Sequence, residues 1–238
     1  MKYQNLQITL AFLLTLLVCN AQESGVRWQV KNESPAYGIT LGYSLPGDQL
    51  QAIIGDKFKP HLNEDGNGYL MLFIAISKQY NLDSTSYDTM TIAHILISSQ
   101  GSLNSPLVIA GENQQINKIF TMYDFKVDIG KIELEVEHKG DSILTEAAIT
   151  TEEGVVRIKA TFLNNPGESV TIESAKVSAP ANPTSFFKGG ESYRPIQIDS
   201  AVIENEGENW ITQLNLPSKP DKIWLSVDFV WDFIFTRE

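Results

Sequence analysis

Residues 68–77 read GYLMLFIAIS, and nearly all of them are apolar. The turn-forming segment 63–67 precedes this run, and the run itself contains aromatic and β-branched side chains. Both features favour a strand over a buried helix. A strand that lacks alternating polar residues has both of its faces covered by protein. The sequence therefore predicts a strand over 68–77 that is buried on both faces.

Further strand patterns extend outward from this run. Residues 86–98 predict a second long strand. Its alternation places Thr91, Ala93, Ile95 and Ile97 on one face and Ile92, His94 and Leu96 on the other. Residues 131–163 contain three segments separated by turns at 139–141 and 152–154, which predicts an antiparallel meander. We expect additional strands at 37–44, 169–177, 193–203, 209–216 and 223–235.

Helix signals are scarce. The best is 46–54 (PGDQLQAII), where a proline near the start precedes Leu50, Ile53 and Ile54 at helical spacing. Residues 178–190 combine prolines and glycines with two phenylalanines, and we interpret them as a long loop over a pocket mouth or barrel end. Many strands with one or two short helices predict a mainly β (α+β) fold, an antiparallel sheet that is closed or nearly closed.

Composition excludes several classes of protein. With 42% hydrophobic residues among 238, the chain has enough apolar material for a core, which excludes global disorder. The formal charge of −11 argues against nucleic acid as a partner and against docking on an anionic membrane surface. The single cysteine excludes a disulfide scaffold and a multi-thiolate metal site.

The first residues have the pattern of a secretory signal. A basic start at Lys2 is followed by an apolar run over 8–18, and Ala21 offers a small residue for cleavage. We therefore expect a signal peptide over 1–21, a single domain over 22–238, and export to the periplasm or the extracellular space. Lipidation of Cys19 is the alternative, and it would be the protein's only attachment to a membrane.

Motifs for common chemistries are absent from the sequence. It contains no Gly-x-Ser-x-Gly elbow, no Walker loop and no Gly-x-Gly-x-x-Gly. Three scattered histidines, His61, His94 and His138, lack partners at metal-ligand spacing. Residues 63–68 match half of a calcium loop, but Ile74 occupies the position that requires a bidentate glutamate. We therefore predict neither a metal site nor a cofactor.

The order of several short segments resembles the acetoacetate decarboxylase-like superfamily. These segments are the helix at 45–54 with Phe58-Lys59-Pro60, the strand at 68–77, Tyr87-Asp88-Thr89, the stretch KIFTMYDFK at 118–126, and the strand at 131–137. The resemblance covers roughly residues 43–162. It implies a cone-like β-barrel with a buried pocket, in which active family members attack a ketone with a lysine amine. It also places the stretch 118–126 on a strand.

The chain departs from the family pattern where the chemistry occurs. An alignment without a gap on Ile119-Phe120 places the family's two lysines on Asp124 and Phe125, with Lys126 one position further. The family's acidic residue is missing or replaced by Asp88. The resemblance thus leaves Lys126, Asp88 and Asp124 as catalytic candidates. The ligand-binding candidates are Tyr87, His94 and Tyr123.

Three hypotheses follow. The first is an exported protein that binds a small keto-acid-like or apolar molecule in the pocket without classical decarboxylation. The second is an active Schiff-base lyase that uses Lys126. The third is an exported β-sandwich or lipocalin-like envelope or interaction protein. A small molecule is the expected partner, nucleic acid is not, and self-association stays open.

Overall fold

A computed structural model describes residues 27–32, 36–111, 113–217 and 219–238. The predicted signal peptide and Cys19 lie outside these residues. Within the described ranges, no helix has both the length and the apolar character that a membrane crossing requires.

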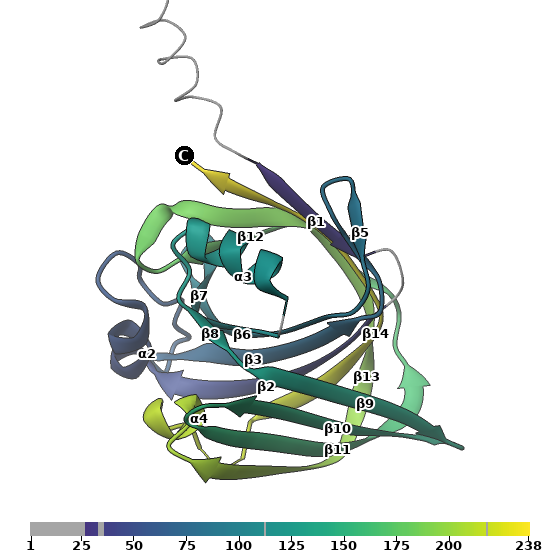
Figure 1. The fold of residues 1–238 in the computed structure, drawn as a ribbon. Helices are drawn as coiled ribbons and strands as arrows, with labels where there is room; N and C mark the ends of the chain where they lie inside the picture. Colours follow the sequence, from purple (N-terminus) through teal and green to yellow (C-terminus); the bar gives the residue numbers. More distant parts are fainter. Residues whose placement is uncertain (1–26, 33–35, 112, 218) are drawn as a thin grey trace, which may run out of the picture.

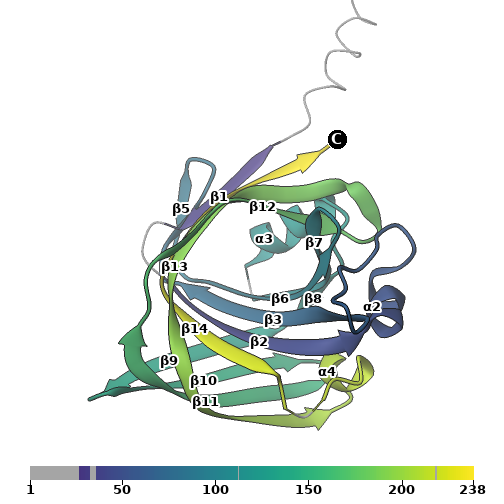
Figure 2. The same ribbon diagram turned by 180° about the vertical axis from the view of Figure 1, so that it is seen from behind.

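Seven strands close into a barrel (Figures 1 and 2). In order around the barrel they are β14 (Lys222–Arg237), β2 (Ala36–Pro46), β3 (Asn67–Ser77), β6 (Met90–Ser99), β7 (Ser102–Ala110), β12 (Val170–Ala179) and β13 (Asn182–Gly207). The pairing of β13 with β14 closes the circle. The β7–β12 pair is parallel, whereas the other six neighbouring pairs are antiparallel. The predicted closed sheet is therefore confirmed, and its purely antiparallel character is corrected to mixed.

The remaining strands extend this barrel. The sheet continues from β13 through β11 (Gly154–Pro166) and β10 (Ser142–Thr151) to β9 (Lys131–Lys139), which confirms the predicted meander. On the other side, β14 continues through β1 (Trp28–Asn32) and β4 (Tyr80–Leu82) to β5 (Thr85–Tyr87). The short strand β8 (Val127–Ile129) pairs in parallel with β7.

The wall formed by β2, β3 and β6 separates two hydrophobic cores. On β3, Leu72 and Ile74 belong to the core between this wall and the layer of β9, β10 and β11, whereas Phe73 and Ala75 face the inside of the barrel. On β6, Ile95 belongs to the first core and Ile92 to the second. From Leu70 onward the apolar run is covered on both faces, as predicted, because it divides the molecule into two compartments (Figure 1). Near its start, Tyr69 is 39% exposed, which corrects the prediction at that residue.

Three helices occur among the described residues. The helix α2 (Gly47–Ile54) confirms the predicted one, and its Leu50 and Ile54 are buried. The helix α3 (Gln114–Met122) lies within the opening of the barrel (Figures 1 and 2). The third, α4 (Trp210–Gln213), is a single turn.

Three local predictions were wrong. Residues 118–122 belong to α3 instead of a strand, because Asn113 caps the helix by accepting hydrogen bonds from the backbone N–H groups of Gln115 and Ile116. Residues 209–216 contain α4 instead of a strand. Residues 178–190 form the tight connection between β12 and β13 and the start of β13, instead of a long loop.

Candidate functional site

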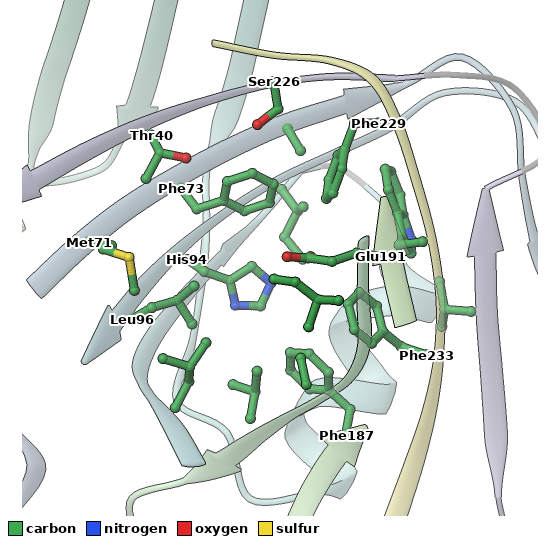
Figure 3. A pocket seen from close by; sticks show the side chains of 18 of the residues that line it. Thr40, Met71, Phe73, His94, Leu96, Phe187, Glu191, Ser226, Phe229 and Phe233 are labelled. Carbon is green, nitrogen blue, oxygen red and sulfur yellow. The ribbon is translucent and has the colours of Figure 1, made fainter. Parts of the chain in front are cut away.

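A cavity of about 250 Å³ lies inside the barrel, between α3 and the strands. Its lining is mostly aromatic and aliphatic and includes Phe73, Phe187, Phe229 and Phe233 (Figure 3). These side chains come from β3, β13 and β14. Strands distant in the sequence therefore build one apolar chamber, and only the closed barrel brings them together.

The closing pair of strands supplies much of the wall. On β13, Phe187 and Glu191 lie opposite Phe235 and Trp231 of β14, and all four line the cavity. Between them, Gly189 lies opposite Phe233, at a position where a Cβ atom would be 1.9 Å from the carbonyl oxygen of Asp232. Only glycine allows β13 to approach β14 this closely.

Apart from the two tryptophans, the lining contains five residues with polar side chains: Thr40, His94, Glu191, Tyr193 and Ser226. Burial lowers the pKa of His94 from 6.5 to about 3, so its imidazole is neutral at pH 7. The Nδ1 atom of His94 lies 3.2 Å from the hydroxyl oxygen of Ser105 on the neighbouring strand β7. The ring also packs edge-on against Phe120 of α3.

Glu191 is the acidic residue of this lining. Its side chain extends from β13 toward the centre of the cavity (Figure 3). Burial raises the pKa of the Glu191 carboxyl, and the carboxylate in turn raises the pKa of Tyr193, after burial itself. Across the described ranges, we find no hydrogen bond or ion pair that compensates the Glu191 carboxylate. A charge-bearing group thus faces an apolar chamber without a partner.

Comparison with solved structures locates this architecture among known folds. A scan against protein-family models finds no match, and no curated protein is similar in sequence. The enduracididine biosynthesis enzyme MppR with bound HEPES superposes with a TM-score of 0.58 at 10% identity, over 90% of this chain and 86% of that one. The acetoacetate decarboxylase from Legionella pneumophila gives a TM-score of 0.51 at 10% identity, over 87% and 84%.

A second acetoacetate decarboxylase structure gives a TM-score of 0.51 at 10% identity, over 89% of this chain and 88% of that one. The protein has the acetoacetate decarboxylase-like fold. The resemblance suggested by the order of the sequence segments is confirmed at this level. MppR has also been solved with pyruvate and with a condensation product of pyruvate and imidazole 4-carboxaldehyde.

Within this acetoacetate decarboxylase-like fold, the candidate amine lies away from the cavity. Lys126 is exposed and follows the turn after α3. In that turn Asp124 has a φ of 62°, which lets Phe125 point inward against Phe120 and Phe187. Because Phe125 takes the inward position, the next side chain is left at the surface. No lysine or arginine belongs to the cavity lining among the described residues.

The two acidic candidates lie on the surface as well. Asp88 is exposed beyond the end of β5. Asp124 is exposed too, and its Oδ2 accepts hydrogen bonds from Asn182 at 2.7 Å, from Ser185 at 2.9 Å and from Arg237 at 2.7 Å. These hydrogen bonds lower the pKa of Asp124, with Asn182 as the largest cause. Through its hydrogen bond with Arg237, this carboxylate links the turn between α3 and β8 to the end of β14.

Of the three ligand-binding candidates, the structure brings only His94 to the cavity. Tyr87 stacks on Tyr80, with 5.3 Å between ring centroids, and Tyr123 is buried against Phe235. Sequence reasoning missed Glu191 and the other polar lining residues. Their inward direction follows from the pairing of β13 with β14, which no local pattern displays. The described residues contain no cluster of three or more histidine, cysteine or acidic side chains that could hold a metal ion.

Proposed function

We propose that the protein binds a small, mostly apolar molecule inside the barrel. The observation that carries this proposal is the cavity of about 250 Å³ with its aromatic and aliphatic lining and few polar groups. Such a lining with a few convergent polar side chains is typical of small-molecule sites. A dry apolar cavity of roughly 150 Å³ already holds benzene, so this chamber has room for a somewhat larger molecule.

Binding without Schiff-base chemistry agrees with the position of the amines. A lysine becomes a nucleophile near neutral pH when burial or a neighbouring cation lowers its pKa. Lys126 is exposed, and no lysine of the described residues lines the cavity. A keto acid would also bring a carboxylate into a lining that holds Glu191 and no fixed cation. We therefore favour an apolar ligand over a keto acid.

The solved neighbours support occupancy by small molecules in this kind of fold. MppR has been solved with HEPES and with pyruvate bound. Export of the chain stays a prediction from residues 1–21, as does its periplasmic or extracellular location. N-terminal sequencing of the protein recovered from fractionated cells tests it, and a chain that still begins at Met1 in the cytoplasm contradicts it.

Propylbenzene is a suitable probe of the cavity. Trp224 and Trp231 both line it, so binding changes the intrinsic tryptophan fluorescence. We expect saturable binding to the wild-type protein and loss of binding in Ala175→Phe, which fills the chamber. The matched control Ser174→Phe carries the same ring at an exposed position of the same strand and should bind normally. Equal binding by both variants would place the site elsewhere.

A trapping experiment tests the absence of Schiff-base chemistry. The folded protein is incubated with pyruvate and borohydride, and its intact mass is measured. We expect no mass increase. A stoichiometric reduced pyruvyl adduct on one particular lysine of the folded protein, absent from the urea-unfolded chain, would contradict the proposal.

A further inference from the structure

We infer that the ligand of the barrel cavity is an apolar amine, whose ammonium group pairs with Glu191 among aromatic rings. This inference rests on the proposed function and specifies the chemical class of the ligand. It starts from the charges of the cavity: the lining contains one acidic side chain and, within the described ranges, no lysine or arginine.

The cations nearest to Glu191 along β13 have other partners. The amine of Lys188 lies 6.0 Å from the ring centroid of Phe186 and does not belong to the cavity lining. The guanidinium of Arg194 donates a hydrogen bond to the carbonyl oxygen of Gly167 and lies 3.6 Å from the carboxylate of Asp228. Neither of these two cations therefore neutralises Glu191, and a cationic ligand would supply the missing counter-charge.

The one histidine of the cavity does not supply a positive charge either. His94 is buried, and its neighbours from the packed elements are the hydroxyl of Ser105 and the rings of Phe120 and Phe187. With a pKa of about 3, its imidazole is neutral at pH 7. It therefore leaves the carboxylate uncompensated.

Aromatic rings surround the position that an ammonium group would take. Trp231 lies directly opposite Glu191 in the β13–β14 register. The ring of Phe229 lies 4.9 Å from that of Trp231, 5.4 Å from that of Phe73 and 6.1 Å from that of Tyr193, centroid to centroid. The faces of such rings attract cations, and desolvation strengthens the attraction.

The cost of burying charge predicts different affinities for an ammonium, a neutral and a carboxylate ligand of similar apolar shape. Folding has already removed Glu191 from much of its water, so an incoming ammonium restores a partner to it. A neutral molecule of the same shape fills the cavity and leaves the carboxylate unpaired. A carboxylate ligand adds a second negative charge to a medium of low polarity, which is unfavourable. Affinity should therefore fall from ammonium to neutral to anion.

Three phenylalkyl probes test this order at pH 7: 2-phenylethylammonium, propylbenzene and 3-phenylpropanoate, of which the first two are isosteric and the third is slightly larger. Binding is followed by tryptophan fluorescence and checked by calorimetry. We expect the wild-type protein to bind the ammonium at least tenfold more tightly than propylbenzene, and to bind the anion more weakly than either. In Glu191→Gln, the ammonium should lose its advantage, while propylbenzene should bind as well or better.

The outcomes separate the inference from the proposed function. If propylbenzene binds the wild-type protein as tightly as the ammonium, the cavity is a site but the inference is overturned. If the ammonium keeps its full advantage in Glu191→Gln, Glu191 does not recognise it and the inference is likewise overturned. If none of the three binds, the proposed function fails too. The ranking in the wild-type protein is decisive even where the variant does not fold.

Discussion

The neutral state of His94 makes the stability of this protein depend on pH. Burial lowers the pKa of His94 from 6.5 to about 3, whereas the unfolded chain keeps the ordinary value. Because the folded pKa is the lower one, the unfolded state takes up the proton first as the pH falls. The stability associated with His94 is therefore complete above pH 6.5 and is lost progressively toward pH 3.

The size of this effect at pH 5 follows from the two pKa values. At pH 5 the solution is about one and a half pH units below the unfolded pKa of 6.5, so the imidazole of the unfolded chain is protonated. The folded imidazole is still neutral at this pH. At about 1.4 kcal/mol per unit, the unfolded state gains about 2 kcal/mol. The exact folded pKa hardly matters here, because pH 5 lies well above it.

Urea unfolding followed by tryptophan fluorescence at pH 8 and pH 5 measures this loss. The comparison protein is His94→Leu, which keeps an apolar side chain beside Phe120 and leaves the Ser105 hydroxyl with the Leu107 carbonyl as its partner. Other titrating groups are shared by the two proteins, so they cancel in the difference. We expect the wild-type protein to lose about 2 kcal/mol more than the variant. Equal losses in the free energy of unfolding for the two proteins would refute the conclusion that His94 is buried and neutral.

Three further predictions concern packing, a polar anchor and cavity shape. Phe187→Ala removes a side chain that is 6% exposed and should lower the free energy of unfolding by about 3–5 kcal/mol in urea titrations; a loss below about 1 kcal/mol would contradict its packing role. Asp124→Asn should lower the melting temperature at pH 7. Because the pKa of Asp124 is lowered in the fold, that deficit should shrink as the pH falls below 3.8, and a deficit that grows in acid would contradict this reasoning. Gly38→Ala places a Cβ atom 2.7 Å from the Phe73 ring, which should push the ring and weaken propylbenzene binding several-fold, whereas Gly42→Ala meets its nearest atoms at 3.6 Å and should not.

Much of the fold could be predicted because its signals are local. The strand at 68–77 is almost wholly apolar, and a strand with that pattern is expected to divide two cores, as β3 does. The alternation on β6 also correctly separated His94 from Ala93 and Ile95. The meander from 131 to 163 has short turns that fix its register. In each case the period of the side chains carries the information.

The error at α3 has a physical explanation. Asn113 caps the helix, and Ile116, Ile119 and Phe120 lie at helical spacing on its buried face. Both signals are present in the sequence, and reading them as a helix would have removed the strand expected there. The family resemblance placed a strand on the same residues, and its segment order outweighed the local pattern.

The chemistry of the cavity was harder to predict than the barrel, because it depends on the position of a single charged side chain. An apolar strand tolerates many substitutions before it stops dividing two cores, whereas moving an amine by one position changes the side of the wall on which it lies. After α3, the left-handed Asp124 and the inward Phe125 send Lys126 to the surface. The barrel closure meanwhile turns Glu191 inward. Among the described residues, the chamber is lined by a carboxylate and by no amine. This favours the opposite partner from a Schiff-base pocket and supports our inference that the ligand is a cation, not a ketone.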